Sequence, residues 1–167
     1  VSSVGLHQKR VSSVLFDTAI FTNLTRDHLD YHETMESYGE NKKKLFMMPG
    51  LKTAIVNLDD SFALSIINSV SSDVEVLTYS LKNKIASVFA ESLELTRNGF
   101  RAKICTPIGM GEITGKLIGY FNFSNVLAVL TALINYLPRH SGINIDSICQ
   151  KISELQPVDG RMEIIGE

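Results

Sequence analysis

The sequence predicts an α/β protein, in which a parallel β-sheet with helices is joined to a small antiparallel sheet. In the first half, apolar segments rich in β-branched residues alternate with segments of helical periodicity, which is typical of βαβ units. In the second half, Asn98-Gly99 separates two alternating segments, which is a strong signal for a β-hairpin. The 167 residues, of which 44% are hydrophobic, suffice for one globular domain with a core.

The first half contains three predicted strands and two predicted helices. In order, they are a strand over 14–24, a helix over 34–46, a strand over 52–57, a helix over 62–70 and a strand over 74–79. The first strand is rich in β-branched and aromatic residues, and Pro49-Gly50 ends the first helix. Asp59-Asp60-Ser61 supplies capping residues for the second helix.

The second half contains three predicted strands followed by two predicted helices. The strands cover 85–95, 99–106 and 111–117, and the helices cover 123–137 and 143–155. Apolar side chains recur at helical spacing along one face of each helix. The predicted inward-facing residues are Val126, Leu130, Leu133 and Leu137 on the first helix and Ile145, Ile148, Ile152 and Leu155 on the second.

The composition excludes several classes of protein. The net charge of −2 and the isoelectric point near 6.1 offer no basic field for nucleic acid or for an anionic membrane. The longest apolar stretch, residues 126–134, is interrupted by Thr131 and is far shorter than the roughly 20 residues of a membrane span. Two cysteines, Cys105 and Cys149, make no disulfide framework, so we expect small buried thiols and a cytoplasmic location.

A polar cluster follows the first predicted strand. Residues 22–32 include Asp27, His28, Asp30 and His32, and loops at the carboxyl ends of parallel strands are where such sheets bind ligands. These side chains offer ligands for a divalent cation, or groups that transfer protons. The alternative is a capped loop-to-helix junction whose histidines are satisfied by backbone carbonyls, because the four residues form no closed ligand set.

Lys42 lies in the apolar stripe of the first predicted helix. At spacings of three and four, this stripe contains Met35, Tyr38, Lys42, Leu45 and Phe46, whereas Lys43 and Lys44 point progressively away. Poor hydration favours the neutral amine of a lysine, which can add carbon dioxide to become a carbamate. The alternative is a lysine whose stem covers the core while its ammonium reaches water.

Two C-terminal segments carry further candidates. Asn122 and Ser124 precede or begin a predicted helix, where either side chain could cap it. Arg161 follows a turn, where it is either a phosphate clamp or a surface cation. Neither segment decides its own role.

Taken together, these segments resemble the central domain of the Mur ligases, the ATP-dependent amide-bond-forming enzymes of bacterial peptidoglycan assembly. The resemblance runs from end to end, and residues 22–32 are its most specific part. It is carried by Val1-Ser2-Ser3 with Gln8 and Arg10, by residues 22–32, by Lys42 before Leu45, by residues 121–125 and by residues 156–163.

The resemblance implies roles for individual residues. Those that match the family's positions for the UDP-N-acetylmuramoyl-dipeptide substrate are Ser2, Gln8 and Arg10. Those that match its magnesium positions are His28, as a ligand, and Lys42, as a carbamate. Those that fall where the family contacts the nucleotide are Asn122 and Arg161. A carbamate oxygen suits Mg²⁺, whereas a free ammonium would repel it.

The resemblance also implies a reaction and its partners. ATP phosphorylates the terminal carboxylate of UDP-N-acetylmuramoyl-L-Ala-D-Glu, and the amine of a diamino acid, the third peptide residue, attacks the acyl phosphate. Mg²⁺ is the expected cofactor, ATP the co-substrate, and a monomer the expected state, without nucleic acid or membrane partners. Positioning and charge neutralisation dominate the first step.

The chain departs from the family in one respect that matters. It contains no G-x-x-x-x-G-K-[ST] phosphate loop, which the family carries upstream. We therefore expect residues 1–157 to be the latter part of a P-loop-type central domain whose first part is missing, and residues 158–167 a junction to a further domain. Such a chain is expected to be inactive alone. The alternatives are a non-catalytic nucleotide-fold binding module and a folylpolyglutamate-type ligase, which should lack the Ser2, Gln8 and Arg10 set.

Overall fold

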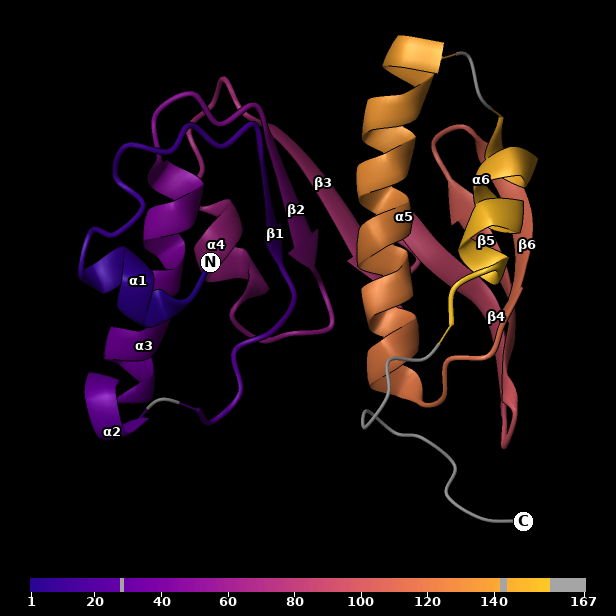
Figure 1. Cartoon of the computed structure of the whole chain (residues 1–167), viewed down its shortest axis with the longest axis horizontal. Coiled ribbons are helices and arrows are strands. Elements are labelled where there is room, and N and C mark those ends of the chain that lie inside the picture. The colour runs from indigo at the N-terminus through magenta and orange to yellow at the C-terminus, as the bar shows by residue number, and fades with distance from the viewer. Residues whose placement is uncertain (28, 142–143, 157–167) are drawn as a thin grey trace. The chain divides into compact units, whose positions relative to one another are not determined.

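The computed structural model describes residues 1–27, 29–141 and 144–156, and Figure 1 labels its helices and strands. The chain divides into two compact units, Val1–Thr78 and Tyr79–Glu167. Strands follow one another in a single hydrogen-bonded order, β1-β2-β3-β4-β5-β6. The α/β class predicted from the sequence is confirmed.

The first unit begins with a short helix and alternates strands with helices thereafter. Its elements are α1 (Ser3–His7), β1 (Thr18–Phe21), α2 (Leu29–His32), α3 (Met35–Lys43), the 3₁₀ helix η1 (Lys44–Met47), β2 (Thr53–Asn57), α4 (Ala63–Ile67) and most of β3 (Glu75–Ser80). β1 is shorter than the predicted strand, and α1 and α2 were not predicted. The predicted helix over 34–46 is present as α3 and η1, and the Thr34 side chain caps it by accepting from the Ser37 amide.

The core of the first unit lies around the two parallel strands β1 and β2. They pair in register from Thr18 with Thr53 to Phe21 with Val56. The side chains of β2 are buried along its whole length, as expected for a parallel strand covered on both faces. Phe21 packs against Phe46 of η1 and against Phe62, with ring centroids 6.4 and 6.2 Å apart. Helix η1 is thereby fixed to the sheet.

Two polar side chains hold the segment that follows β1. Asn57 donates from Nδ2 to the Thr22 carbonyl at 2.7 Å. Asp60 accepts from the Leu24 amide through Oδ2 and from the Phe62 amide through Oδ1, each at 2.8 Å. The Asp60 bond to the Phe62 amide closes a turn just before α4, whose N-cap residue is Phe62 and which has no side-chain cap, so the predicted capping of this helix by residues 59–61 is wrong. Asp60 instead anchors the beginning of the polar cluster of residues 22–32.

The second unit contains an antiparallel sheet and two helices. Its elements are β4 (Val88–Thr96), β5 (Gly99–Thr106), β6 (Gly109–Gly115), α5 (Tyr120–Ser141) and α6 (Ile145–Ser153). β4 pairs in parallel with the end of β3, at Tyr79 with Val88, while β4, β5 and β6 are antiparallel. Gly99 has φ +141°, and a Cβ there would lie 1.9 Å from the Gly115 carbonyl oxygen. The predicted hairpin at Asn98-Gly99 is confirmed.

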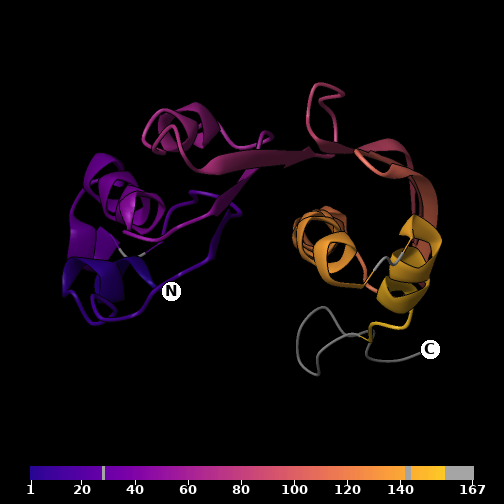
Figure 2. The same cartoon turned by 90° about the horizontal axis from the view of Figure 1, so that it is seen from above.

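Helices α5 and α6 lie on the same face of the β4–β6 sheet (Figure 2). α5 starts three residues before the predicted helix and ends four residues after it. Over Tyr120–Leu137 it is long and apolar enough to cross a membrane by length and composition alone, which the shorter predicted stretch was not. Phe123, Leu127 and Leu130 are fully buried, however, so this face of α5 is part of the unit's core.

Helix α6 packs on β6 with most of its predicted face. Ile145, Ile148 and Ile152 are buried, but Leu155 is exposed because α6 ends at Ser153. Cys149 lies on the same face, and a Cβ at Gly111 of β6 would approach its Sγ to 2.7 Å. Glycine at position 111 is therefore what lets α6 pack this closely on the strand.

Cys149 is expected to make the stability of the fold depend on alkaline pH. Burial, and secondarily the charge of Asp146, raise the pKa of the Cys149 thiol from 9.0 to about 11. As pH rises, the unfolded chain therefore loses the thiol proton before the folded chain does. The contribution of this group to the free energy of unfolding is complete below pH 9 and is lost as pH rises towards 11. The expected loss is about 2–3 kcal/mol.

Urea denaturation at several pH values between 9 and 11 measures this effect as a change in the free energy of unfolding. The Cys149→Ala variant is the matched comparison, because it keeps the other titrating groups. The difference in free energy of unfolding between the unmodified protein and Cys149→Ala should become smaller as pH rises over this range. A difference that is independent of pH would contradict the assignment.

Candidate functional site

The predicted substrate residues flank α1, a helix that the sequence did not predict. Ser2 is exposed and caps α1, its Oγ accepting from the Gly5 amide at 3.1 Å. Gln8 and Arg10 are also exposed, and Lys9 between them takes the left-handed conformation with φ 56°. This turn ends α1 and changes the direction of the chain before Arg10. Exposed polar side chains therefore lie at both ends of α1, with Ser2 at its start and Gln8 and Arg10 after its end.

The surface end of α1 is held by Tyr31 of α2. The Tyr31 hydroxyl lies 2.9 Å from Nδ1 of His7 and accepts from Nε2 of Gln8 at 3.2 Å. The His7 and Tyr31 rings meet edge to face, with centroids 5.5 Å apart. One predicted substrate residue, Gln8, is thus already positioned by a tyrosine that the sequence did not single out.

The inner end of α1 is held by His32, the residue next to Tyr31. Nε2 of His32 lies 2.9 Å from Oγ of Ser3, and Nδ1 lies 3.4 Å from Nδ2 of Asn41 on α3. All three side chains are buried. Glu33, with φ 65°, makes the sharp turn between α2 and α3 that brings the imidazole back against α3.

Asn41 extends this network to a lysine. Its Nδ2 also donates to the Ser37 carbonyl at 2.8 Å, and its Oδ1 accepts from Nζ of Lys44 at 2.6 Å. The sequence pattern placed Lys44 away from the apolar stripe, and the structure explains where it goes. The ammonium is held by the buried amide of Asn41, one turn earlier in the chain, at the end of α3.

Lys42 is half-buried, and its Nζ lies 4.9 Å from the centroid of the Tyr38 ring. This cation–π contact places the lysine on the predicted face of α3. The next residue, Lys43, forms an ion pair with Glu40, in which its Nζ lies 2.8 Å from Oε1. Tyr38 also stacks on His32, with ring centroids 5.2 Å apart and an interplanar angle of 17°. The Tyr38 ring therefore contacts both Lys42 and the buried imidazole.

The two predicted metal-supporting residues are Lys42 and His28. His28, the predicted magnesium ligand, lies outside the described residues, as do Arg161 and the predicted junction over 158–167. Among the described residues, no group of three histidine, cysteine, aspartate or glutamate side chains could hold a metal ion. Within the predicted cluster, Asp27 and Asp30 are exposed, while His32 points into the helices. His32 thus corresponds to the alternative of a satisfied histidine, although its partners are side chains.

Asn122 lies in the second unit, within the first turn of α5. Its Nδ2 donates to the Ile118 carbonyl at 2.8 Å. The expectation that Asn122 or Ser124 caps this helix is wrong, because α5 already begins at Tyr120. The predicted nucleotide contact of Asn122 stays a prediction.

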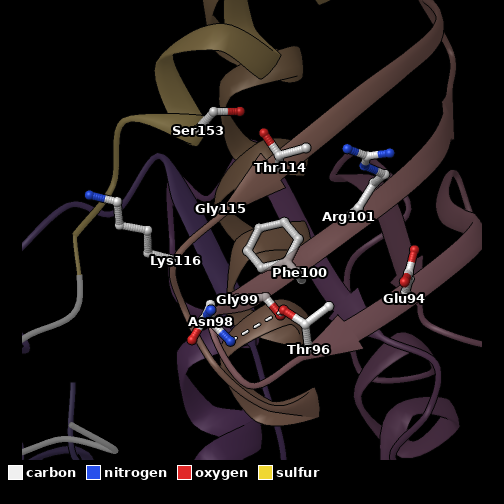
Figure 3. Close-up of a pocket in the computed structure, with 10 residues that line it drawn as sticks. All are labelled: Glu94, Thr96, Asn98, Gly99, Phe100, Arg101, Thr114, Gly115, Lys116 and Ser153. Atoms are coloured by element: carbon white, nitrogen blue, oxygen red, sulfur yellow. Dashed lines mark hydrogen bonds between the residues drawn. The ribbon is translucent and has the colours of Figure 1, made fainter. Parts of the chain in front are cut away.

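The second unit also has an open cavity of about 520 Å³ beside the β4–β5 turn. Figure 3 shows Phe100 at its centre, with the Arg101 and Lys116 side chains at its edges. Lys116 donates to Oε1 of Gln156 at 3.3 Å. None of the predicted site residues that the structure describes lines this cavity.

Sequence reasoning missed the residues that hold the site together. These residues are Ser3, Tyr31, Tyr38 and Asn41, together with His32 in its structural role. A signal was available on α3, where Tyr38 is three residues from Asn41 and four residues from Lys42, so it is a helix neighbour of both. No signal of this kind exists for Ser3, which depends on how α1 docks.

Comparison with known protein families shows which class of domain this α/β fold belongs to. The chain belongs to the family of the Mur ligase middle domain, whose sequence model matches residues 1–133. The chain is 41% identical over 166 residues to the UDP-N-acetylmuramoyl-L-alanyl-D-glutamate–2,6-diaminopimelate ligase of Ectopseudomonas mendocina (strain ymp), covering 99% of this chain and 33% of that protein. The ligase of the same name from Coxiella burnetii (strain RSA 493 / Nine Mile phase I) is 41% identical over 169 residues, covering 99% of this chain and 34% of that protein.

Solved structures agree with this assignment. A structure of a UDP-N-acetylmuramoyl-L-alanyl-D-glutamate–2,6-diaminopimelate ligase superposes with a TM-score of 0.87 at 32% identity, covering 100% of this chain and 34% of that chain. The MurF ligase of Thermotoga maritima in complex with ADP gives a TM-score of 0.69 at 16% identity, covering 100% and 36%. The second likeness concerns the fold alone. The chain spans about a third of the length of the relatives that it matches.

Proposed function

We propose that the complete protein containing this chain is an ATP-dependent ligase that joins 2,6-diaminopimelate to UDP-N-acetylmuramoyl-L-alanyl-D-glutamate. The observation that carries this proposal is the 41% identity over 99% of the chain to enzymes of that name. In this proposal the chain supplies part of the middle domain, and the protein acts as a cytoplasmic monomer in peptidoglycan synthesis. Choice of the diamino acid rests with a domain outside this chain.

In this function, the polar residues that flank α1 bind the UDP-muramoyl-dipeptide. Ser2, Gln8 and Arg10 are exposed and belong to one short segment, which supports a shared ligand. The Arg10 guanidinium suits a phosphate or carboxylate of the substrate. Asn122 and Arg161 are proposed to contact the nucleotide.

Lys42 is proposed to act as a carbamate. Its half-buried position on the predicted face of α3, beside Tyr38, supports this assignment. Together with His28, the carbamate would hold Mg²⁺ through hard oxygen and imidazole donors. When bound, this ion would neutralise charge on the transferred phosphoryl group.

The proposed reaction has two balanced steps. A carboxylate oxygen of the dipeptide forms a bond to the γ-phosphorus of ATP, and the bond from that phosphorus to the bridging oxygen breaks, which releases ADP. The diamino acid nitrogen then bonds to the acyl carbon, the carbon–oxygen bond to phosphate breaks, and the amine loses a proton. The chain's residues contribute by holding the carboxylate in the orientation from which it can attack the γ-phosphorus.

Replacing Arg10 tests the substrate assignment. Arg10→Ala in the complete protein should raise the KM for the UDP-muramoyl-dipeptide about ten-fold, because a charge-assisted contact is lost. The KM for ATP should stay unchanged. Arg97→Ala, which removes an exposed arginine at the β4–β5 turn, is the matched control. Equal kinetic constants for both variants would contradict the role of Arg10.

The reaction itself is tested by product analysis. The complete protein is incubated with ATP, Mg²⁺, UDP-N-acetylmuramoyl-L-alanyl-D-glutamate and 2,6-diaminopimelate, and ADP and the coupled product are measured by mass spectrometry. Lysine replaces diaminopimelate in one control, and folate with glutamate replaces both substrates in another. Product only with folate would establish the folylpolyglutamate-type ligase. Substrate binding without any ADP release would establish the binding module.

A further inference from the structure

His32 connects three helices through its two ring nitrogens and its ring face. Ser3 on α1 lies 2.9 Å from Nε2, and Asn41 on α3 lies 3.4 Å from Nδ1. The ring face stacks on Tyr38 of α3. The imidazole itself belongs to α2 and is 4% exposed. A buried side chain with this set of contacts fixes α1 against α3.

The orientation of Asn41 determines the tautomer of His32. Oδ1 of Asn41 faces the Lys44 ammonium, which can only donate, and Nδ2 faces the Ser37 carbonyl, which can only accept. The second hydrogen of Nδ2 therefore points to Nδ1 of His32. In the neutral imidazole Nδ1 then accepts, which assigns the ring proton to Nε2 and makes Oγ of Ser3 its acceptor. The direction of donation runs from Lys44 through Asn41 and His32 to Ser3.

This chain of donors ends beside the proposed substrate residues. Ser3 follows Ser2, and the far end of α1 is held by the Tyr31 hydroxyl, which accepts from Gln8. Tyr31 and His32 are neighbours on α2, so this short helix holds α1 at both ends. On the α3 side of His32, the Tyr38 ring stacks on the imidazole. Nζ of Lys42 lies 4.9 Å from the centroid of the same Tyr38 ring.

We propose that His32 is a positioning residue that locks the substrate-binding segment of α1 to the helix that carries Lys42. The inference rests on the proposed function for what α1 and Lys42 bind. His32 touches no reacting atom in this role. It acts through Ser3 on one side and through Asn41 and Tyr38 on the other, so that substrate carboxylate and Lys42 keep a fixed separation.

The test removes one hydrogen bond at a time in the complete protein. Ser3→Ala deletes the acceptor on α1 and leaves α2 and α3 intact. His32→Phe keeps an aromatic ring for Tyr38 but deletes both hydrogen bonds, whereas His32→Gln keeps a donor for Ser3. Ser69→Ala is the matched control, because it removes a side-chain hydrogen bond to the Ile66 carbonyl elsewhere in the same unit.

Two measurements separate positioning from general stability. Hydrogen exchange of the α1 amides should accelerate about two- to ten-fold in Ser3→Ala and His32→Phe, and not in Ser69→Ala. The KM for the UDP-muramoyl-dipeptide should rise by a similar factor, with the KM for ATP unchanged. His32→Gln should restore part of both properties. The effects of Ser3→Ala and His32→Phe should not add in the double variant.

Each outcome decides a different statement. Unchanged exchange in α1 would overturn the lock between α1 and His32. Faster exchange with an unchanged KM in an active ligase would overturn the positioning role. A protein that neither ligates nor binds the UDP-muramoyl-dipeptide would refute the proposed function instead, while the exchange data would still decide whether His32 holds α1.

Discussion

Replacing Lys42 by alanine is expected to lower the ligase activity of the complete protein by at least about 100-fold, because it removes the proposed carbamate support of Mg²⁺. Lys42→Arg should be equally impaired. The guanidinium can keep a cation over the Tyr38 ring, but it cannot form the carbamate. The pair of variants therefore separates the loss of a cation–π contact from the loss of the metal-supporting group.

The control for Lys42 is its neighbour Lys43. Lys43→Ala removes an ion pair with Glu40 and the packing of a largely buried aliphatic stem, neither of which supports the metal, and it should leave activity within about two-fold. Formate or acetate should restore part of the activity of Lys42→Ala, because a small carboxylate can occupy the space of the side chain. A carbamate signal from isotope-labelled bicarbonate, recorded by NMR, should be present in the unmodified protein and absent in both Lys42 variants. Full activity of Lys42→Arg would refute the carbamate.

The elements with strong local signals were predictable from the sequence. Asn98-Gly99 specifies the hairpin because its turn requires a backbone that glycine adopts readily, as the φ of +141° at Gly99 shows. Thr34 caps α3, and the apolar run over β2 forms a buried parallel strand. In each case, the residues that determine the element lie within it or beside it.

The short helices α1 and α2 were not predictable in this way. α1 has five residues and contains Gly5, so its intrinsic tendency to form a helix is weak. Its stability comes from docking, since Ser3 contacts a histidine 29 positions away in the chain. Helix α2 is followed by Glu33 in the left-handed conformation, which glutamate does not favour and which its residue type therefore does not indicate.

The site was predictable where helix periodicity governs it and not where side chains meet across helices. The face of Lys42 followed from the spacing on α3, and its contact with Tyr38 agrees. His32 was grouped with Asp27 and Asp30 as a candidate ligand because the three are close in sequence. Its partners are Ser3 and Asn41, which only the packing of α1, α2 and α3 brings to it.

Phe123→Ala is expected to have the largest effect on stability among the changes considered for the second unit. Phe123 is fully buried on α5, and its ring centroid lies 4.8 Å from that of Phe100 on β5. Truncation leaves a cavity between the helix and the sheet, which should cost about 3–5 kcal/mol. Phe121→Ala is the matched control, because the same residue type on the same helix is 75% exposed there. It should change the free energy of unfolding by about 0.5 kcal/mol or less.

The two phenylalanines also test whether α5 is a core helix or only an apolar one. Length and composition treat positions 121 and 123 alike, whereas packing on β5 distinguishes them. Native-state hydrogen exchange of the α5 amides measures the local free energy of opening, which should fall in Phe123→Ala and stay unchanged in Phe121→Ala. Equal losses in both variants would mean that the outer face of α5 is covered as fully as the inner one. Both faces of α5 would then be buried against other surfaces, and the β4–β6 sheet would be one of the two.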